Sequence, residues 1–332
     1  MDIVLSYIIP FYQGEDTIDK CLDSIYNIGL CENDFEIIVV DDASPCLASK
    51  VLQSYLYVHK NLHIVRHEKN KRQGGAKNTG IRYAQGTYIA FADQDDIVIA
   101  KNIHQALSLA LETNVSMLAC NYVVQYQDFS TKEFGLNLGK SMITTGRDFC
   151  ENYFDGSINL APWAYLYNRA FLLHTTHPYA ENVTMEDADW IAWHLIHAPK
   201  IAVCNTAIYC WCMNPLSITH SQCYINRADW IYFGYRKIKD AELYRDISNK
   251  FANIMIEDGR YNIIGGMKKV WKVDDYCLFY RRITPILSEL QEQSWPRMVG
   301  FLFNNPRVSL VLLYTMGSVM KIIQYARNKI LY

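Results

Sequence analysis

The first 125 residues alternate short apolar runs with stretches in which apolar positions recur every three or four residues. The runs predict strands at 3–9, 35–40, 62–66, 87–92 and 115–124. Helical patterns fall between them, near 15–28, 46–59, 75–84 and 101–112. This alternation is typical of α/β proteins, in which helices cover both faces of a mostly parallel central sheet.

The remainder of the chain has a different pattern. From about residue 125 the alternation gives way to irregular, aromatic-rich segments, among them 159–171 and 181–195. The second of these predicts a helix with Glu186 and Asp187 in its first turn, where negative charge favours the helix dipole. After about residue 226 the pattern is mainly helical, so we predict a helical C-terminal region.

Composition narrows the range of partners. A formal net charge of −2 with 20% charged residues gives no global basic surface, so nucleic acid is not an expected partner. The ten cysteines are scattered singly, which favours reduced thiols, and Cys210 and Cys212 fit one face of a strand better than a zinc site. Because the N-terminus lacks the pattern of a targeting peptide, we expect a cytoplasmic protein.

Polar residues collect directly after the first four predicted strands. They are Tyr12, Gln13 and Glu15 after the first, Asp41 and Asp42 after the second, Arg66 and His67 after the third, and Asp93, Asp95 and Asp96 after the fourth. The carboxyl ends of parallel strands share one edge of a sheet, and ligands bind beyond that edge. We therefore expect these side chains to line one crevice.

Two stretches at this edge suggest particular ligands. In "AFADQDDIV", Asp93, Asp95 and Asp96 would repel one another if all were ionised, so the stretch predicts a bound cation that prefers oxygen ligands. In "NKRQGGAKNTG", two glycines and Lys77 come at the start of a predicted helix. That arrangement suits a phosphate, although two glycines before a helix more often form a simple turn.

Four segments together resemble the family 2 glycosyltransferases, which are inverting enzymes of the GT-A fold that use nucleotide-sugar donors. The segments are "YIIPFYQGEDTIDKCLDSI", "FEIIVVDDAS", "NKRQGGAKNTGIRYAQGTYIAFADQDD" and "EDADW", in the family's order. The resemblance implies a GT-A domain at 1–225, with a nucleotide-sugar-binding half (1–124) and an acceptor-binding half (125–225). The helical region 226–332 would follow it.

The resemblance also implies a donor site. Asp93 and Asp95 match the DXD motif that binds Mn²⁺ or Mg²⁺, with Asp95 as the main metal ligand, Asp93 nearer the ribose and Asp96 behind them. Asp42 matches the residue that accepts a hydrogen bond from the uracil N3–H, and Tyr12 matches the aromatic residue that stacks on the base. The nucleotide-binding residues implied are Pro10, Tyr12, Glu15, Asp42, Gly75, Lys77, Asn78, Asp93 and Gln94.

The sequence departs from the family pattern at two donor-site positions. Lys77 stands where many relatives have arginine, which replaces a planar fork of donors with a point charge. Gln13 stands in place of the more usual asparagine.

On the acceptor side, Asp187 matches the family's catalytic base, which takes the proton of the attacking hydroxyl. Neighbouring residues on a helix point about 100° apart, so only one of Glu186 and Asp187 is expected to act as the base. Glu186 and Trp163 are assigned to acceptor binding, although Trp163 taken alone fits a core position as well. His220 is either a residue that reaches the diphosphate or a surface histidine.

The resulting prediction is an inverting, metal-dependent glycosyltransferase. It would move a sugar from a UDP-sugar to a hydroxyl of a glycan or lipid-linked saccharide in bacterial surface polysaccharide synthesis. Two alternatives remain open: a haloacid-type phosphatase, because "DQDDI" superficially fits its signature, and a non-catalytic nucleotide-sugar-binding protein.

The segment 297–332 has five basic residues and no acidic ones. One interpretation places it on the inner face of the cell membrane, where its cations meet anionic headgroups. The other packs it against the protein's own core.

Overall fold

The computed structural model describes residues 3–135, 142–153, 161–175, 177–214, 223–267, 278, 279, 281–283 and 286. His220 and the segment 297–332 lie outside these residues. The chain divides into two compact units, one formed by 1–215 with 244–254 and the other by 216–243 with 255–332. The assignment of separate roles to 1–225 and 226–332 stays a prediction.

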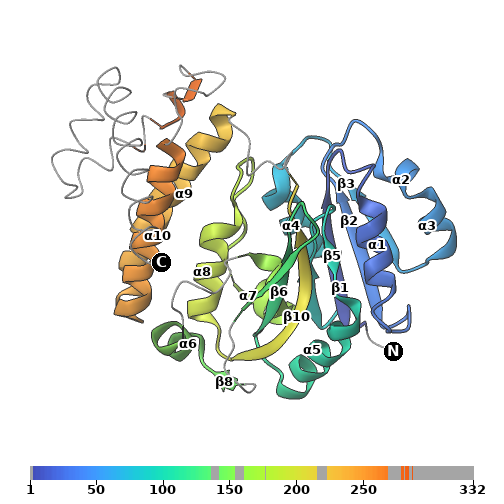
Figure 1. The fold of residues 1–332 in the computed structure, drawn as a ribbon, viewed down its shortest axis with the longest axis horizontal. Coiled ribbons are helices and arrows are strands. Elements are labelled where there is room, and N and C mark those ends of the chain that lie inside the picture. The colour runs from blue at the N-terminus through green and yellow to red at the C-terminus, as the bar shows by residue number, and fades with distance from the viewer. Residues whose placement is uncertain are drawn as a thin grey trace. The chain divides into compact units, whose positions relative to one another are not determined.

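A ten-stranded mixed sheet forms the centre of the described part of the first unit (Figure 1). In chain order its strands are β1 (Leu5–Phe11), β2 (Phe35–Asp41), β3 (Leu62–Arg66), β4 (Tyr88–Phe91), β5 (Ile97–Val98), β6 (Met117–Gln125), β7 (Thr131–Phe134), β8 (Met142–Thr144), β9 (Tyr165–Asn168) and β10 (Ile201–Cys212). The main path across the sheet is β3-β2-β1-β4-β9-β6-β10-β5, with β7 paired to β6 and β8 to β10.

The predicted parallel strands are confirmed, and their apolar runs explain their position. β1 pairs in parallel with β2 and β4, and β2 pairs in parallel with β3. Every residue of β1 and of β2 is buried, as expected for parallel strands covered on both faces. The carboxyl ends of β1 to β4 therefore meet at one edge of the sheet.

The central position of β9 was not predicted. This four-residue strand lies within the segment 159–171, which the sequence indicated as irregular, and it pairs antiparallel with both β4 and β6. With β5, β7 and β8, which also pair antiparallel with their neighbours, it makes the sheet mixed. So short a strand has no periodicity of its own, and its partners on either side supply the pairing that defines it.

Helices flank the sheet much as the sequence predicts. Those of the first unit are α1 (Ile18–Tyr26), α2 (Ala48–Val51), α3 (Gln53–Val58), α4 (Arg72–Tyr83), α5 (Ala100–Thr113), α6 (Gly146–Asn152), α7 (Arg169–His174) and α8 (Asp187–His197), with a 3₁₀ turn at Pro162–Ala164. The helix expected near 46–59 is split in two at Leu52. α4 packs on β1 and β2, where a Cβ on Gly80 would come within 2.2 Å of Ile8 Cγ2. Gly80 thus permits this close packing.

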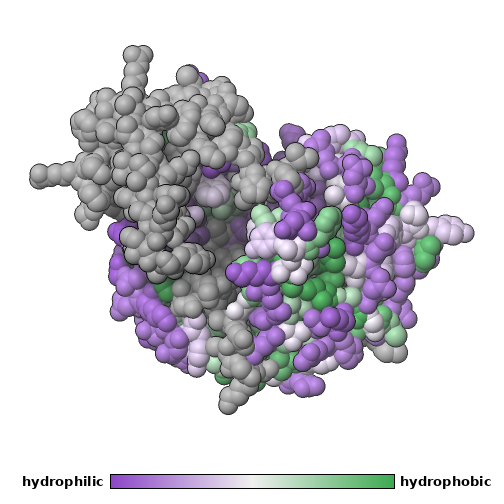
Figure 2. All heavy atoms as spheres, in the orientation of Figure 1, coloured by the Kyte–Doolittle hydropathy of each residue, from purple (hydrophilic) through white to green (hydrophobic). Residues whose placement is uncertain are grey.

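Most of the described residues of the second unit belong to α9 (Tyr224–Tyr244) and α10 (Asn249–Met267). The last residue of α9 and the first turns of α10 are assigned to the first unit. Lys237 forms an ion pair with Asp258, and Arg282 binds Asp229 at 2.7 Å. None of the helices within the described residues combines the length and hydrophobicity that a membrane crossing requires. Hydrophilic side chains cover much of the visible face of the described residues, with smaller apolar groups between them (Figure 2).

A buried histidine of α8 contacts the residue that follows α7. His194 is 1% exposed; its Nδ1 lies 2.7 Å from the carbonyl oxygen of Trp190 and its Nε2 lies 3.0 Å from Thr175 Oγ1. Burial lowers the pKa of His194 to about 3, with smaller contributions from His177 and His197. The ring is therefore neutral in the folded protein at neutral pH.

We expect His194 to make the folded state less stable in acid. Its pKa is about 3 in the folded protein and 6.5 in the unfolded chain, so the unfolded chain binds the extra proton as the pH falls below 6.5. Stability should fall by up to about 1.4 kcal/mol per pH unit from this group. Urea unfolding of wild type and His194→Gln at pH 7, 6, 5 and 4 measures it. The difference between the two proteins should change in favour of the variant below pH 6.5, and parallel curves would contradict the assignment.

Candidate active site

The acidic turn after β4 contains one carboxylate that is committed to the protein itself. Asp96 accepts hydrogen bonds from the Tyr209 hydroxyl and from the Cys212 backbone N–H, both at 2.8 Å. The same Tyr209 oxygen accepts the backbone N–H of Asp93 at 2.8 Å. Tyr209 and Cys212 belong to β10, so a distant strand fixes the shape of this turn. Asp93 and Asp95 are the two carboxylates of the turn that are not committed to β10, and Asp95 has a hydrogen bond from the Asn214 side chain.

Burial makes ionisation of this turn unfavourable. It raises the pKa of Asp93 to about 6, with Asp95 and Glu186 adding to the shift and Lys77 opposing it. Burial also raises the pKa of Asp95, and it raises that of Asp96 to about 9 with help from both neighbours. A bound cation would favour the ionised forms, and two carboxylates are hard oxygen donors of the kind that Mg²⁺ and Mn²⁺ take. Asp93 and Asp95 therefore fit such an ion as a partial ligand set.

These two carboxylates would need other ligands to complete the coordination. Within the described residues, no group of three or more His, Cys, Asp or Glu side chains has the arrangement of a metal site. Mg²⁺ in particular is usually held by one or two carboxylates together with substrate phosphates and water.

A buried lysine links the donor side of the site to the start of α8. Lys77 on α4 donates to Glu186 Oε1 at 2.7 Å, and the two side chains are 2% and 5% exposed. Burial alone would lower the pKa of Lys77, but the carboxylates of Glu186, Asp93 and Asp187 together raise it above its ordinary value. Lys77 therefore stays charged and offsets the negative charge of all three.

Asp187 is the first residue of α8 and lies in this same cluster. Its pKa is raised to about 7, mainly by burial and also by Glu186 and Asp93, while Lys77 opposes the shift. A carboxylate with a pKa near neutrality is well suited to general base catalysis, because it is substantially ionised yet basic enough to accept a proton. The structure thus brings together Lys77, Asp93, Glu186 and Asp187, which are far apart in the sequence.

The loop before α8 is held in place by α4. Both groups of the Asn78 side-chain amide bond the backbone of Tyr179, at 2.9 Å each. A Cβ on Gly74 would lie 2.1 Å from the carbonyl oxygen of Ala180, so the loop reaches its position only because residue 74 has no side chain. A Cβ on Gly75 would lie 2.3 Å from Lys71 Cβ. The observed contacts of Asn78 and Gly75 are thus internal, and their predicted contact with a nucleotide stays untested.

The turn after β1 presents an aromatic ring on a fixed backbone. The Gln94 amide bonds the backbone of Tyr12 twice, with Tyr12 N–H donating to Oε1 at 3.0 Å and Nε2 donating to the Tyr12 carbonyl at 2.9 Å. The Tyr12 side chain is 42% exposed, so its ring is accessible to a base. Pro10 is buried within β1. Glu15 lines a cavity of about 540 Å³ whose other walls are Gln13, Pro45, Cys46, Leu47 and Lys50.

The two aspartates at the end of β2 have different roles. Asp41 accepts from the Ser44 and Ala48 backbone N–H groups and from Arg66, which shapes the loop into α2. Asp42 is 3% exposed and accepts from His67 and from the Lys71 backbone N–H through Oδ1 alone. Asp42 is therefore the one whose second carboxylate oxygen has no protein donor among the described residues, and its predicted contact with the base stays a prediction.

Trp163 occupies a core position. It is 8% exposed and stacks on Tyr209, with ring centroids 4.6 Å apart, while Tyr122 meets it edge-on at 5.0 Å. Trp163 therefore supports Tyr209, which shapes the acidic turn. The role of Trp163 in acceptor binding stays a prediction. No pattern in the sequence pointed to Tyr209, because β10 reaches the turn only in the folded chain.

Comparison with known proteins assigns the family. A family model described as "Glycosyl transferase family 2" matches residues 6–171, half of the 332-residue chain. The chain therefore belongs to glycosyl transferase family 2. Its structure resembles that of S. aureus TarS 1-349 in complex with UDP-GlcNAc, with a TM-score of 0.67 at 20% identity over 94% of this chain and 89% of that one. The predicted GT-A fold is confirmed.

Two curated proteins and a second solved structure are also similar to the chain. The uncharacterized glycosyltransferase EpsJ of Bacillus subtilis is 26% identical over 220 residues, which is 65% of this chain and 63% of EpsJ. The Escherichia coli protein WfgD, named as a UDP-Glc:alpha-D-GlcNAc-diphosphoundecaprenol beta-1,3-glucosyltransferase, is 33% identical over 124 residues, or 37% of this chain and 47% of WfgD. The chain thus spans less than two thirds of either relative. Mannosyltransferase PcManGT from Pyrobaculum calidifontis, solved with GDP-Man and Mn²⁺, has a TM-score of 0.54 at 16% identity over 97% of this chain and 85% of PcManGT.

We expect the Lys77–Glu186 pair to be strongly coupled energetically. Lys77→Met leaves three carboxylates without their cation, and Glu186→Gln leaves a buried ammonium without its closest partner, so each should cost roughly 3–5 kcal/mol. The Lys77→Met/Glu186→Gln double variant should cost clearly less than the sum, because neither charge is then left alone. Urea unfolding of the four proteins gives the coupling. Additive losses would mean that the pair is not the main support of this cluster.

Proposed function

We propose that the protein is an inverting, metal-dependent glycosyltransferase that moves a sugar from a UDP-sugar to an acceptor hydroxyl. The observation that carries the proposal is the cluster of Lys77, Asp93, Glu186 and Asp187. It places a carboxylate with a pKa near 7 beside an acidic turn that fits a cation. An inverting displacement needs both: a base for the incoming hydroxyl and positive charge for the leaving diphosphate.

In this mechanism Asp187 takes the proton of the acceptor hydroxyl. The acceptor oxygen forms a bond to the anomeric carbon on the face opposite the nucleotide, the bond between that carbon and the phosphate oxygen breaks, and UDP leaves with the electron pair. Asp93 and Asp95 would hold the cation, which supplies charge stabilisation to the departing diphosphate. Lys77 limits the repulsion between Asp93 and Asp187, so both can be ionised in one buried site.

The donor and acceptor classes are supported by residues and by relatives. The exposed Tyr12 ring and the spare oxygen of Asp42 suit a uracil base, and the name of WfgD and the contents of the TarS complex both include a UDP-sugar. The name of WfgD also specifies a diphosphoundecaprenol-linked acceptor, and another relative is named as a poly(ribitol-phosphate) beta-glucosyltransferase. We infer an acceptor in bacterial surface polysaccharide synthesis, reached from the cytoplasmic side, with 297–332 as the segment that would contact the membrane.

The two alternatives have less support. A haloacid-type phosphatase places its nucleophilic aspartate after the first strand, whereas Asp93 and Asp95 follow β4. A non-catalytic sugar-nucleotide-binding protein has no need of a carboxylate whose pKa lies near neutrality, yet Asp187 has one.

Asp187→Asn should abolish transfer and leave donor binding intact, because the amide keeps the size of the side chain but accepts no proton at neutral pH. We expect a loss of at least 10²-fold in kcat, measured by UDP release in the presence of acceptor. Calorimetric titration with UDP should give an unchanged affinity. Asp148→Asn, which changes an exposed first-turn acid of α6, is the matched control. Normal transfer by the Asp187→Asn protein would rule out this residue as the base.

Asp95→Ala should remove the metal dependence of donor binding. In wild type, Mn²⁺ should strengthen UDP binding, because the cation joins a carboxylate to the diphosphate. In the variant, the affinity with Mn²⁺ should fall roughly 10- to 100-fold towards the metal-free value, as expected for losing a charged contact. Calorimetry with and without Mn²⁺ measures both. If Mn²⁺ improves UDP binding equally in both proteins, Asp95 is not a metal ligand.

A further inference from the structure

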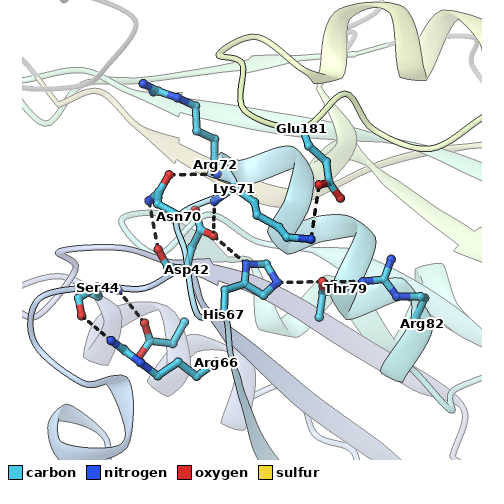
Figure 3. Close-up of polar contacts among 11 residues, drawn as sticks. Asp42, Ser44, Arg66, His67, Asn70, Lys71, Arg72, Thr79, Arg82 and Glu181 are labelled. Carbon is cyan, nitrogen blue, oxygen red and sulfur yellow. Dashed lines mark hydrogen bonds and ion pairs between the residues drawn. The ribbon is translucent and has the colours of Figure 1, made fainter.

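The Asp42 carboxylate is held from one side only (Figure 3). Its Oδ1 accepts His67 Nδ1–H at 2.7 Å and the Lys71 backbone N–H at 2.8 Å, while its backbone carbonyl accepts Asn70 Nδ2–H at 3.0 Å. In the described part of the chain, no donor reaches Oδ2. Two donors on one oxygen fix the plane of the carboxylate and leave Oδ2 as the oxygen able to accept from a ligand.

His67 is itself held in one orientation. Its side chain is 8% exposed, and its Nε2 lies 2.8 Å from Thr79 Oγ1 on α4. Arg82 donates to the same hydroxyl oxygen at 2.8 Å. Because Nδ1 must carry the hydrogen that Asp42 accepts, a neutral His67 leaves Nε2 to accept the Thr79 hydroxyl hydrogen. The chain Arg82–Thr79–His67–Asp42 then uses each hydrogen once and passes from α4 to the end of β2.

We propose that His67 is a positioning residue for nucleobase selection, which aims Asp42 Oδ2 at a ring N–H and so favours uracil over cytosine. The inference rests on the proposed function, in which Asp42 accepts the N3–H of the base. Uracil has a hydrogen on N3, whereas N3 of cytosine is an acceptor that a carboxylate would repel. A side-chain donor on Oδ1 is the part of this arrangement that substitution can remove, since the Lys71 contact is made by the backbone.

Two substitutions separate the two hydrogen bonds of His67, one to Asp42 and one to Thr79. In His67→Asn the amide nitrogen takes the place of Nδ1, so the bond to Asp42 can persist while the bond to Thr79 is lost. In His67→Gln the amide lies near the place of Nε2, so the bond to Thr79 can persist while the bond to Asp42 is lost. His67→Leu removes both, and His63→Leu, which changes a half-exposed histidine of β3, the strand that His67 directly follows, is the matched control.

The test is calorimetric titration with UDP and with CDP, both with Mn²⁺, on wild type and these variants, and on Asp42→Asn. We expect wild type, His67→Asn and His63→Leu to prefer UDP. His67→Gln and His67→Leu should bind UDP roughly tenfold more weakly while CDP binding stays the same. In steady-state assays the KM for the UDP-sugar should rise and kcat should stay the same.

Each other result has a distinct meaning. If Asp42→Asn loses the preference for UDP but His67→Gln and His67→Leu keep it, the inference is overturned and the proposed function stands. Equal weakening of UDP and CDP by His67→Leu would reduce His67 to a structural role and also overturn the inference. If wild type binds neither nucleotide, the proposed function fails, and the inference fails with it.

Discussion

The buried ion pair between Lys77 and Glu186 is the constraint on which the rest of the site depends. Two charges that are almost fully removed from water need each other, because either one alone would face a desolvation cost of several kcal/mol. The pair also fixes the start of α8, which places Asp187 within the electrostatic reach of Asp93. The same ion pair thus supports the structure and positions the residue proposed as the catalytic base.

Helix α4 contacts residues on both the donor side and the acceptor side of the site. Three consecutive residues of a helix point about 100° apart, and here each has a different partner. Lys77 binds Glu186, Asn78 binds the backbone of Tyr179, and Thr79 meets His67 behind Asp42. One turn of α4 therefore positions the residues assigned to the donor base and those assigned to proton transfer, and the glycines at 74 and 80 allow that turn to approach its neighbours closely.

The acidic turn shows a comparable division of labour among like residues. Both carboxylate oxygens of Asp96 accept hydrogen bonds from β10, and Trp163 stacks on Tyr209, one of the two donors. The turn therefore keeps its shape without any ligand. Asp93 and Asp95 are not tied to β10 in this way, and Asp95 is bonded by the Asn214 side chain beyond the end of that strand. Carboxylates of the same kind, within four positions of one another, differ because only one of them faces donors from another strand.

Local periodicity and the points at which the apolar runs end were enough to predict the parallel strands, their flanking helices and the edge at which the polar residues meet. The family motifs also predicted site roles for Asp42, Asp93, Asp95 and Asp187. Four features emerged only in the folded chain: the central place of β9, the ion pair of Lys77 with Glu186, the bond from Tyr209 to Asp96 and the bond from His67 to Asp42. Each of these contacts brings together residues that are far apart in the chain. Their stabilising energy comes from burial and close contact, which a local sequence pattern does not reveal.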